Sequence, residues 1–184
     1  MKKEITKKIA LSGLFIALGL VLPFITGSIP KVGRMMLPMH IPVLLCGFIC
    51  GARYGAMTGF VVPLLRSALW GTPYFPIAAL SMAFELMTYG FVSGFLYDKS
   101  KQQGAGAVYR CLIAAMLSGR VIFGVVKYLL TMALGNGETY TLALFWGDAF
   151  ASAVPGMIIQ LALIPAVMLA LDRSGLVRFR KLSL

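Results

Sequence analysis

The chain has 184 residues and a net charge of +11, yet 59% of its residues are apolar and only 12% are charged. Soluble domains carry about 25% charged residues, so this chain has too little polar surface to cover a water-soluble globule. The composition excludes an ordinary soluble enzyme, a disordered protein and a disulfide-stabilised secreted domain. It indicates an integral membrane protein that forms a single domain.

Six apolar stretches follow one another along the chain, separated by short segments rich in polar residues, glycine and proline. A membrane-spanning helix needs about 20 apolar residues, so six spans use most of the chain and leave no room for a separate soluble domain. We therefore predict an all-α integral membrane fold over residues 1–184, with six transmembrane helices in one domain. The expected spans are residues 9–25, 40–52, 54–70, 74–97, 108–134 and 145–171.

The basic residues fall unevenly on the two sides of this six-span arrangement. With the N-terminus inside, twelve Lys and Arg residues lie on the cytoplasmic side and three, Lys31, Arg34 and Arg66, on the outer side. Cytoplasmic segments of membrane proteins are enriched in Lys and Arg, so we expect both termini to be cytoplasmic. This topology explains the positive charge without nucleic acid as a partner. The twelve cytoplasmic positions are 2, 3, 7, 8, 53, 99, 101, 110, 173, 178, 180 and 181.

The sequence contains no motif for catalysis, ATP hydrolysis or metal binding. There is one histidine, His40, and neither a phosphate-binding glycine loop nor a nucleophile elbow. The cysteines, Cys46, Cys50 and Cys111, lie in apolar stretches and are expected to pack as small apolar residues. We therefore expect no catalytic residue, no metal and no cofactor. Any energy input must come from another chain or from an ion gradient.

Ionisable residues inside the predicted spans are the most informative, because each is costly in hydrocarbon and needs a partner or a cavity. Glu85 lies near the middle of the fourth span and Arg120 near the middle of the fifth. Lys127 follows Arg120 by seven residues, about 10 Å outward on the same helix face, with Gly124 between them. Two interpretations stay open. Glu85 and Arg120 form a structural ion pair, or Arg120 and Lys127 flank a seat for an anion.

Polar residues also line one face of the fourth and sixth spans at helical spacing, and we favour a shared cavity over hydrogen bonds between helices as the explanation. Trp70, at the outer end of the third span, either lines this site or belongs to an interfacial belt of aromatic residues. We expect His40 to make a hydrogen bond in a loop rather than to bind a metal. The candidate substrate-binding residues are Lys127, Arg120, Gly124, Glu85, Tyr89, Asp148, Gln160, Asn136, Trp70 and His40.

The first span has a face of small residues, Ala10, Gly13 and Ala17. Small residues four apart let another helix approach closely. This face serves either internal packing or the docking of a partner, and the pattern alone does not decide between the two.

Two segments of the chain resemble the substrate-binding S components of energy-coupling factor (ECF) transporters. One is the run Leu37–Gly51, LPMHIPVLLCGFICG, followed by ARYGA, and the other is Phe75–Leu86, FPIAALSMAFEL. The size, the six spans and the short second helix agree with this family, and the resemblance covers nearly the whole chain. It implies an S-component-like bundle in the plasma membrane of a prokaryote.

The resemblance also implies a function. Such a subunit captures a water-soluble vitamin and docks, within the lipid bilayer, onto an ECF module made of a transmembrane coupling subunit and two ATPase subunits. Members of the family bind the vitamin near the outer face, between spans four to six and loops one, three and five. Small residues of their first span contact the coupling subunit, and in this chain Gly13 and Ala17 have the required spacing.

The identity of the vitamin does not follow from the resemblance, because S components for different vitamins share one fold. Two cations inside the spans favour an anionic ligand, so we expect pantothenate, a small carboxylate. Riboflavin, stacked on aromatic residues, is the alternative. A function of a different class is a secondary carrier driven by protons through Glu85, although the sequence has no inverted repeat that would support alternating access.

Overall fold

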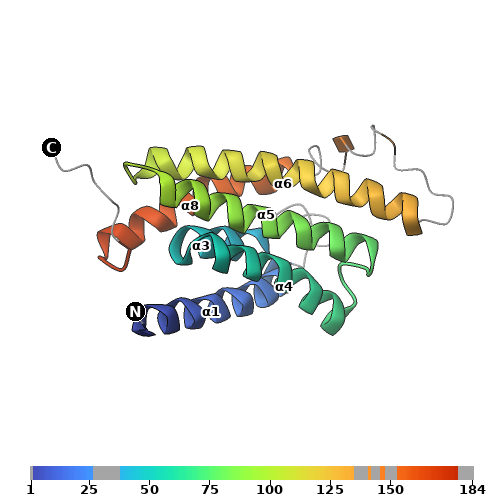
Figure 1. The fold of residues 1–184 in the computed structure, drawn as a ribbon, viewed down its shortest axis with the longest axis horizontal. Helices are drawn as coiled ribbons and strands as arrows, with labels where there is room; N and C mark the ends of the chain where they lie inside the picture. The colour runs from blue at the N-terminus through green and yellow to red at the C-terminus, as the bar shows by residue number, and fades with distance from the viewer. Residues whose placement is uncertain (1, 27–37, 135–140, 142–145, 148–152, 178–184) are drawn as a thin grey trace.

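The computed structural model of the chain describes residues 2–26, 38–134, 141, 146–147 and 153–177. These residues form an all-helical bundle, as predicted, in which α5 lies at the centre and contacts α3, α4 and α6 (Figure 1). Helix α1 packs on α3 and α4 at one edge, and α8 packs on α6 and α3 at the other. The helices are α1 (Lys2–Thr26), α3 (His40–Cys50), α4 (Ala52–Trp70), α5 (Ile77–Lys99), α6 (Ala105–Leu134) and α8 (Val154–Arg173).

Four of the described helices, α1, α5, α6 and α8, are long and apolar enough to cross a membrane. Helix α3 has 11 residues, and at 1.5 Å per residue it covers only about half of a hydrocarbon core roughly 30 Å thick. Helix α4 has 19 residues, but Arg53 and Arg66 make it less apolar than the others. The described residues thus form six helices at the expected places, and the crossing of the membrane by all six stays a prediction.

Helices α3 and α4 are joined by a single residue, Gly51. Its backbone has φ 97° and ψ 171°, and its N–H donates to the carbonyl oxygen of Gly47 to close α3. Residues with a Cβ atom rarely adopt this positive φ, whereas glycine does so without strain. The reversal that follows the short α3 therefore depends on glycine at this position.

Glycine residues allow α5 to lie directly against its neighbours. A Cβ atom at Gly90 of α5 would overlap the backbone of Gly55 in α4, and one at Gly59 would overlap the backbone of Leu86. A Cβ atom at Gly47 of α3 would lie 2.6 Å from the carbonyl oxygen of Gly90. Small residues at such crossings bring two backbones into van der Waals contact, which is the main source of helix association in a membrane.

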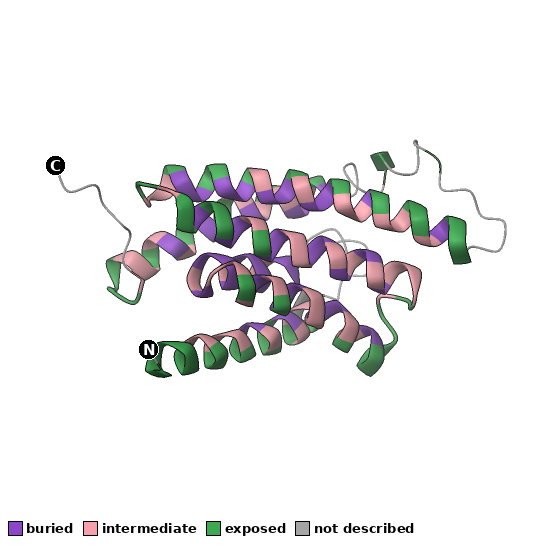
Figure 2. Cartoon of the chain, viewed as in Figure 1, coloured by how far each residue is buried: buried purple, intermediate pink, exposed green. Residues whose placement is uncertain are grey.

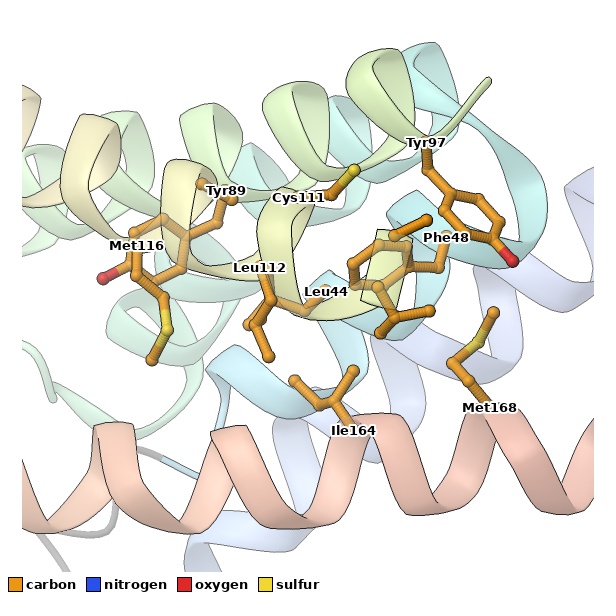
Figure 3. Close-up of a cluster of buried hydrophobic side chains, with 12 residues drawn as sticks. Leu44, Phe48, Tyr89, Tyr97, Cys111, Leu112, Met116, Ile164 and Met168 are labelled. Atoms are coloured by element: carbon orange, nitrogen blue, oxygen red, sulfur yellow. The ribbon is translucent and has the colours of Figure 1, made fainter. Parts of the chain in front are cut away.

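The largest cluster of buried apolar side chains lies between α3, α5, α6 and α8. In Figure 3, Ile164 and Met168 of α8 point toward Leu44 and Phe48 of α3. Figure 2 shows that buried residues are frequent in α3 and α5, whereas α1 is mostly exposed or half-buried. Large apolar side chains are exposed along the outer faces of α1, α6 and α8. Such a surface is suited to lipid, because soluble proteins rarely expose contiguous apolar patches of this extent.

Candidate functional site

Glu85 joins three helices through one carboxylate oxygen. Its Oε1 atom lies 3.1 Å from Nη1 of Arg120 in α6 and 3.5 Å from Nε2 of His40 in α3. None of the three residues is more than 3% exposed. The structural ion pair between Glu85 and Arg120 is thus present. The expectation of His40 in a loop was wrong, because this residue begins α3 and its ring is buried beside Glu85.

Tyr89 lies one turn after Glu85 on α5 and is completely buried. Its ring packs edge-on against His40, with 5.3 Å between ring centroids and 61° between ring planes. The ring also occupies the place that a Cβ atom of Gly119 in α6 would take. Glycine at position 119 therefore lets the Tyr89 ring lie against the backbone of α6, beside the ion pair.

Several buried polar atoms around this ion pair have no hydrogen-bond partner among the described residues. They are the hydroxyl of Tyr89, both ring nitrogens of His40, Oε1 of Glu85, Nε and Nη2 of Arg120, and both amide atoms of Gln160 in α8. Gln160 is completely buried. Because more than nine in ten buried polar groups in proteins are paired, such a concentration is unusual and requires an explanation.

The helix register places His40, Tyr89 and Gln160 at one level of the bundle. Each precedes by eight residues a core residue of its own helix, and those three core residues, Phe48, Tyr97 and Met168, lie together at one end of the cluster in Figure 3. Eight residues correspond to about 12 Å along a helix. We use the name polar layer for the residues at and beside this level, which are His40, Glu85, Tyr89, Arg120 and Gln160.

Lys127 and Gly124 lie further along α6, beyond the polar layer. Gly124 is buried, Lys127 is half-buried, and the Nζ atom of Lys127 lies 5.5 Å from the centroid of the Phe123 ring. Seven residues, about 10 Å of helix, separate Lys127 from Arg120. The two cations thus differ in environment, since Arg120 is buried in an ion pair and Lys127 is closer to the surface.

The remaining candidate residues lie elsewhere. Trp70 is exposed at the end of α4, and its ring packs edge-on against Phe24 of α1 at 5.0 Å. This contact fits the interfacial alternative better than a place in the polar layer. Asn136 and Asp148 lie outside the described residues.

The small residues of α1 form an exposed face. Ala10, Gly13 and Ala17 are all exposed, and a Cβ atom at Gly13 would have no atom within 4 Å. Gly19, in contrast, is buried against Val62 of α4. Internal packing therefore explains Gly19 but not the Ala10, Gly13 and Ala17 face.

Comparison with known proteins identifies a family over most of this arrangement. The family described as ECF transporter, substrate-specific component, matches residues 7–168. The biotin transporter BioY of Rhizobium etli is similar to the chain, with 28% identity over 173 residues, which cover 84% of this chain and 87% of BioY. No solved structure matches the chain. The matched region includes every residue of the polar layer as well as Lys127 and the exposed face of α1.

Proposed function

Since the chain belongs to the family of substrate-specific (S) components of ECF transporters, we propose that it captures a water-soluble vitamin that carries a carboxylate. S components are multi-pass membrane subunits without catalytic activity, which bind a vitamin and associate with an energy-coupling module. The family match carries the proposal of a vitamin-capturing subunit. The carboxylate is inferred from two cations, Arg120 and Lys127, which lie along one face of α6.

We assign the carboxylate of the ligand to Lys127. The guanidinium of Arg120 has Glu85 as its counter-charge at 3.1 Å. Lys127 is the next cation outward on the same helix, at the end of α6 where S components take up their substrate. A charge in a partly desolvated site gains from an opposite charge on the ligand. We place Gly124 between the two cations.

Two monocarboxylate vitamins suit this seat. Pantothenate follows from the charge of the site alone, and biotin is favoured by the similarity to a biotin transporter. Riboflavin has no carboxylate, so it would not use Lys127. Transport itself requires the energy-coupling module, and we assign the exposed face of Ala10, Gly13 and Ala17 to the coupling subunit of that module.

Binding to the detergent-solubilised protein, measured by isothermal titration calorimetry, tests the substrate. We expect biotin or pantothenate to bind and Lys127→Met to weaken binding by about 30-fold or more, since removing one partner of a buried charge pair costs roughly 2–5 kcal/mol. Lys99→Met is the matched control. Like Lys127, Lys99 follows a phenylalanine by four residues and holds its Nζ atom over that ring, at 4.2 Å from the centroid of Phe95. It lies at the other end of the bundle, so affinity should not change.

Equal affinities of the wild type and Lys127→Met for the carboxylate vitamin would overturn the carboxylate seat. Binding of riboflavin but of neither carboxylate would overturn the substrate class. Co-purification separates the transporter classes, because an S component brings ATPase subunits with it and a proton-driven carrier does not.

A further inference from the structure

The polar layer has donors and acceptors but little net charge to offer a ligand. Glu85 and Arg120 compensate each other, and the hydroxyl of Tyr89 and the amide of Gln160 are neutral. An anion would have to compete with Glu85 for Arg120. An uncharged group that both donates and accepts hydrogen bonds would instead pair with several of the unpartnered donors and acceptors without disturbing the ion pair.

Leaving these atoms unpaired is costly. A buried donor or acceptor without a partner costs about 1–3 kcal/mol, and in the polar layer such atoms come from four helices, α3, α5, α6 and α8. The other end of the same core shows that such a concentration of unpartnered polar atoms is not general in this bundle. There, Phe48, Met168 and the ring of Tyr97 pack together with a single unpartnered hydroxyl, that of Tyr97.

We propose that the polar layer is the inner end of the ligand site and that it binds an uncharged amide or ureido group of the vitamin through Tyr89, Arg120 and Gln160. The inference rests on the proposed function, because the outer end of the same ligand is the carboxylate held by Lys127. Gln160 is carried by α8, which packs on α6 and α3.

The distance between the inner end of the proposed site, the polar layer, and its outer end, Lys127, sets the length of the ligand. Seven residues of α6, about 10 Å, separate Arg120 from Lys127. The ligand is therefore elongated, with its neutral hydrogen-bonding group and its carboxylate at opposite ends. Biotin meets this requirement, since its pentanoate chain separates the ureido ring from the carboxylate. Its ureido group presents two N–H donors and one carbonyl acceptor to the layer.

Two conservative variants test the inference, with a control on the same helix. Tyr89→Phe removes one hydroxyl, and Tyr97→Phe makes the identical change eight residues later, where the hydroxyl is also buried and unpartnered. We expect Tyr89→Phe to weaken biotin binding about 5-fold, the effect of one neutral hydrogen bond, and Gln160→Leu to weaken it by about 10-fold or more. Tyr97→Phe should bind as the wild type does. Thermal unfolding of each ligand-free variant confirms that it is folded.

The ligand can be varied in parallel. Biotin amide keeps the ureido ring but lacks the carboxylate, so Tyr89→Phe and Gln160→Leu should weaken its binding as they weaken that of biotin, whereas Lys127→Met should not. Equal affinity of the wild type, Tyr89→Phe and Gln160→Leu would overturn the inner site. An effect of these two variants without an effect of Lys127→Met would support the inner site and overturn the carboxylate seat. If the wild type binds neither biotin nor pantothenate, the proposed substrate class and the inner site both fail.

Discussion

Arg120 of α6 and Glu85 of α5 form a buried ion pair, with 3.1 Å between Nη1 and Oε1 and at most 3% of either residue exposed. In hydrocarbon, each of these charges alone would be expensive, and the pair removes most of that cost. The same oxygen of Glu85 lies 3.5 Å from Nε2 of His40. The pair thus fixes the relative positions of α3, α5 and α6 at the level of the polar layer.

Removing Arg120 should destabilise the protein more than removing both charges. Arg120→Met leaves the carboxylate of Glu85 buried without its cation, which costs about 3–5 kcal/mol in comparable sites. The double variant Glu85→Gln, Arg120→Met leaves no buried charge in the pair, so it should recover part of this loss. Unfolding of the detergent-solubilised proteins measures both values. Equal stability of the single and double variants would contradict a compensating ion pair.

The glycine contacts of α5 predict a second difference in stability. Gly90→Ala puts a Cβ atom into the backbone of Gly55, which cannot move aside as a flexible side chain can. Overpacking of this kind costs about 1–3 kcal/mol. Gly13→Ala makes the same change on α1, where no atom lies within 4 Å of the new Cβ atom, so stability should not fall. Helix propensity favours alanine over glycine at both positions, so equal changes of stability in the two variants would contradict the close approach at Gly90.

The sequence predicted features that depend on composition or on local periodicity. The all-helical membrane fold follows from the scarcity of charged residues. The cost of charges inside apolar stretches makes the pairing of Glu85 with Arg120 one of two open interpretations, and the structure shows that pair. The start of α5 at Ile77 instead of residue 74 has a local cause in Pro76, whose ring disfavours helical backbone angles at the preceding residue, Phe75.

Other features depend on tertiary structure and have no local signal. His40 lies 45 positions before Glu85 in the sequence, and only the packing of α3 on α5 brings the two together. In the sequence, nothing distinguishes Gly119 from any other glycine in an apolar helix. Its role becomes visible only when the ring of Tyr89 is found against it. The sequence raises His40 as a candidate residue, but nothing in it indicates that Glu85 is the neighbour of its ring.

Labelling of introduced cysteines tests the topology. The N-terminal end of α1, the connection between α5 and α6, and the end of α8 lie at the same end of the bundle (Figure 1). Both termini and position 102 should therefore face the cytoplasm. In intact cells, a membrane-impermeant maleimide should label Asn136→Cys but not Gln102→Cys, and permeabilised cells should label both. The native cysteines are buried, which keeps the background low. Labelling of Gln102→Cys in intact cells would reverse the orientation.

The exposed face of α1 leads to the last prediction, which separates docking from substrate binding. Gly13→Leu should abolish vitamin uptake by cells that contain the energy-coupling module, because a leucine side chain prevents a partner helix from approaching the backbone of α1. Vitamin binding to the isolated variant should stay as in the wild type, since a Cβ atom at position 13 has no atom of the other described helices within 4 Å.

Gly106→Leu is the control for Gly13→Leu, because Gly106 is also exposed and also has no atom within 4 Å of an added Cβ atom, but lies on α6. Uptake should be unchanged in this variant if the effect belongs to the face of α1 and not to an added leucine. Co-purification with the ATPase subunits should be lost in Gly13→Leu alone. Loss of both binding and uptake in Gly13→Leu would instead indicate a folding defect. Normal uptake would exclude this face as the docking surface, since no helix could then be in close contact with residue 13.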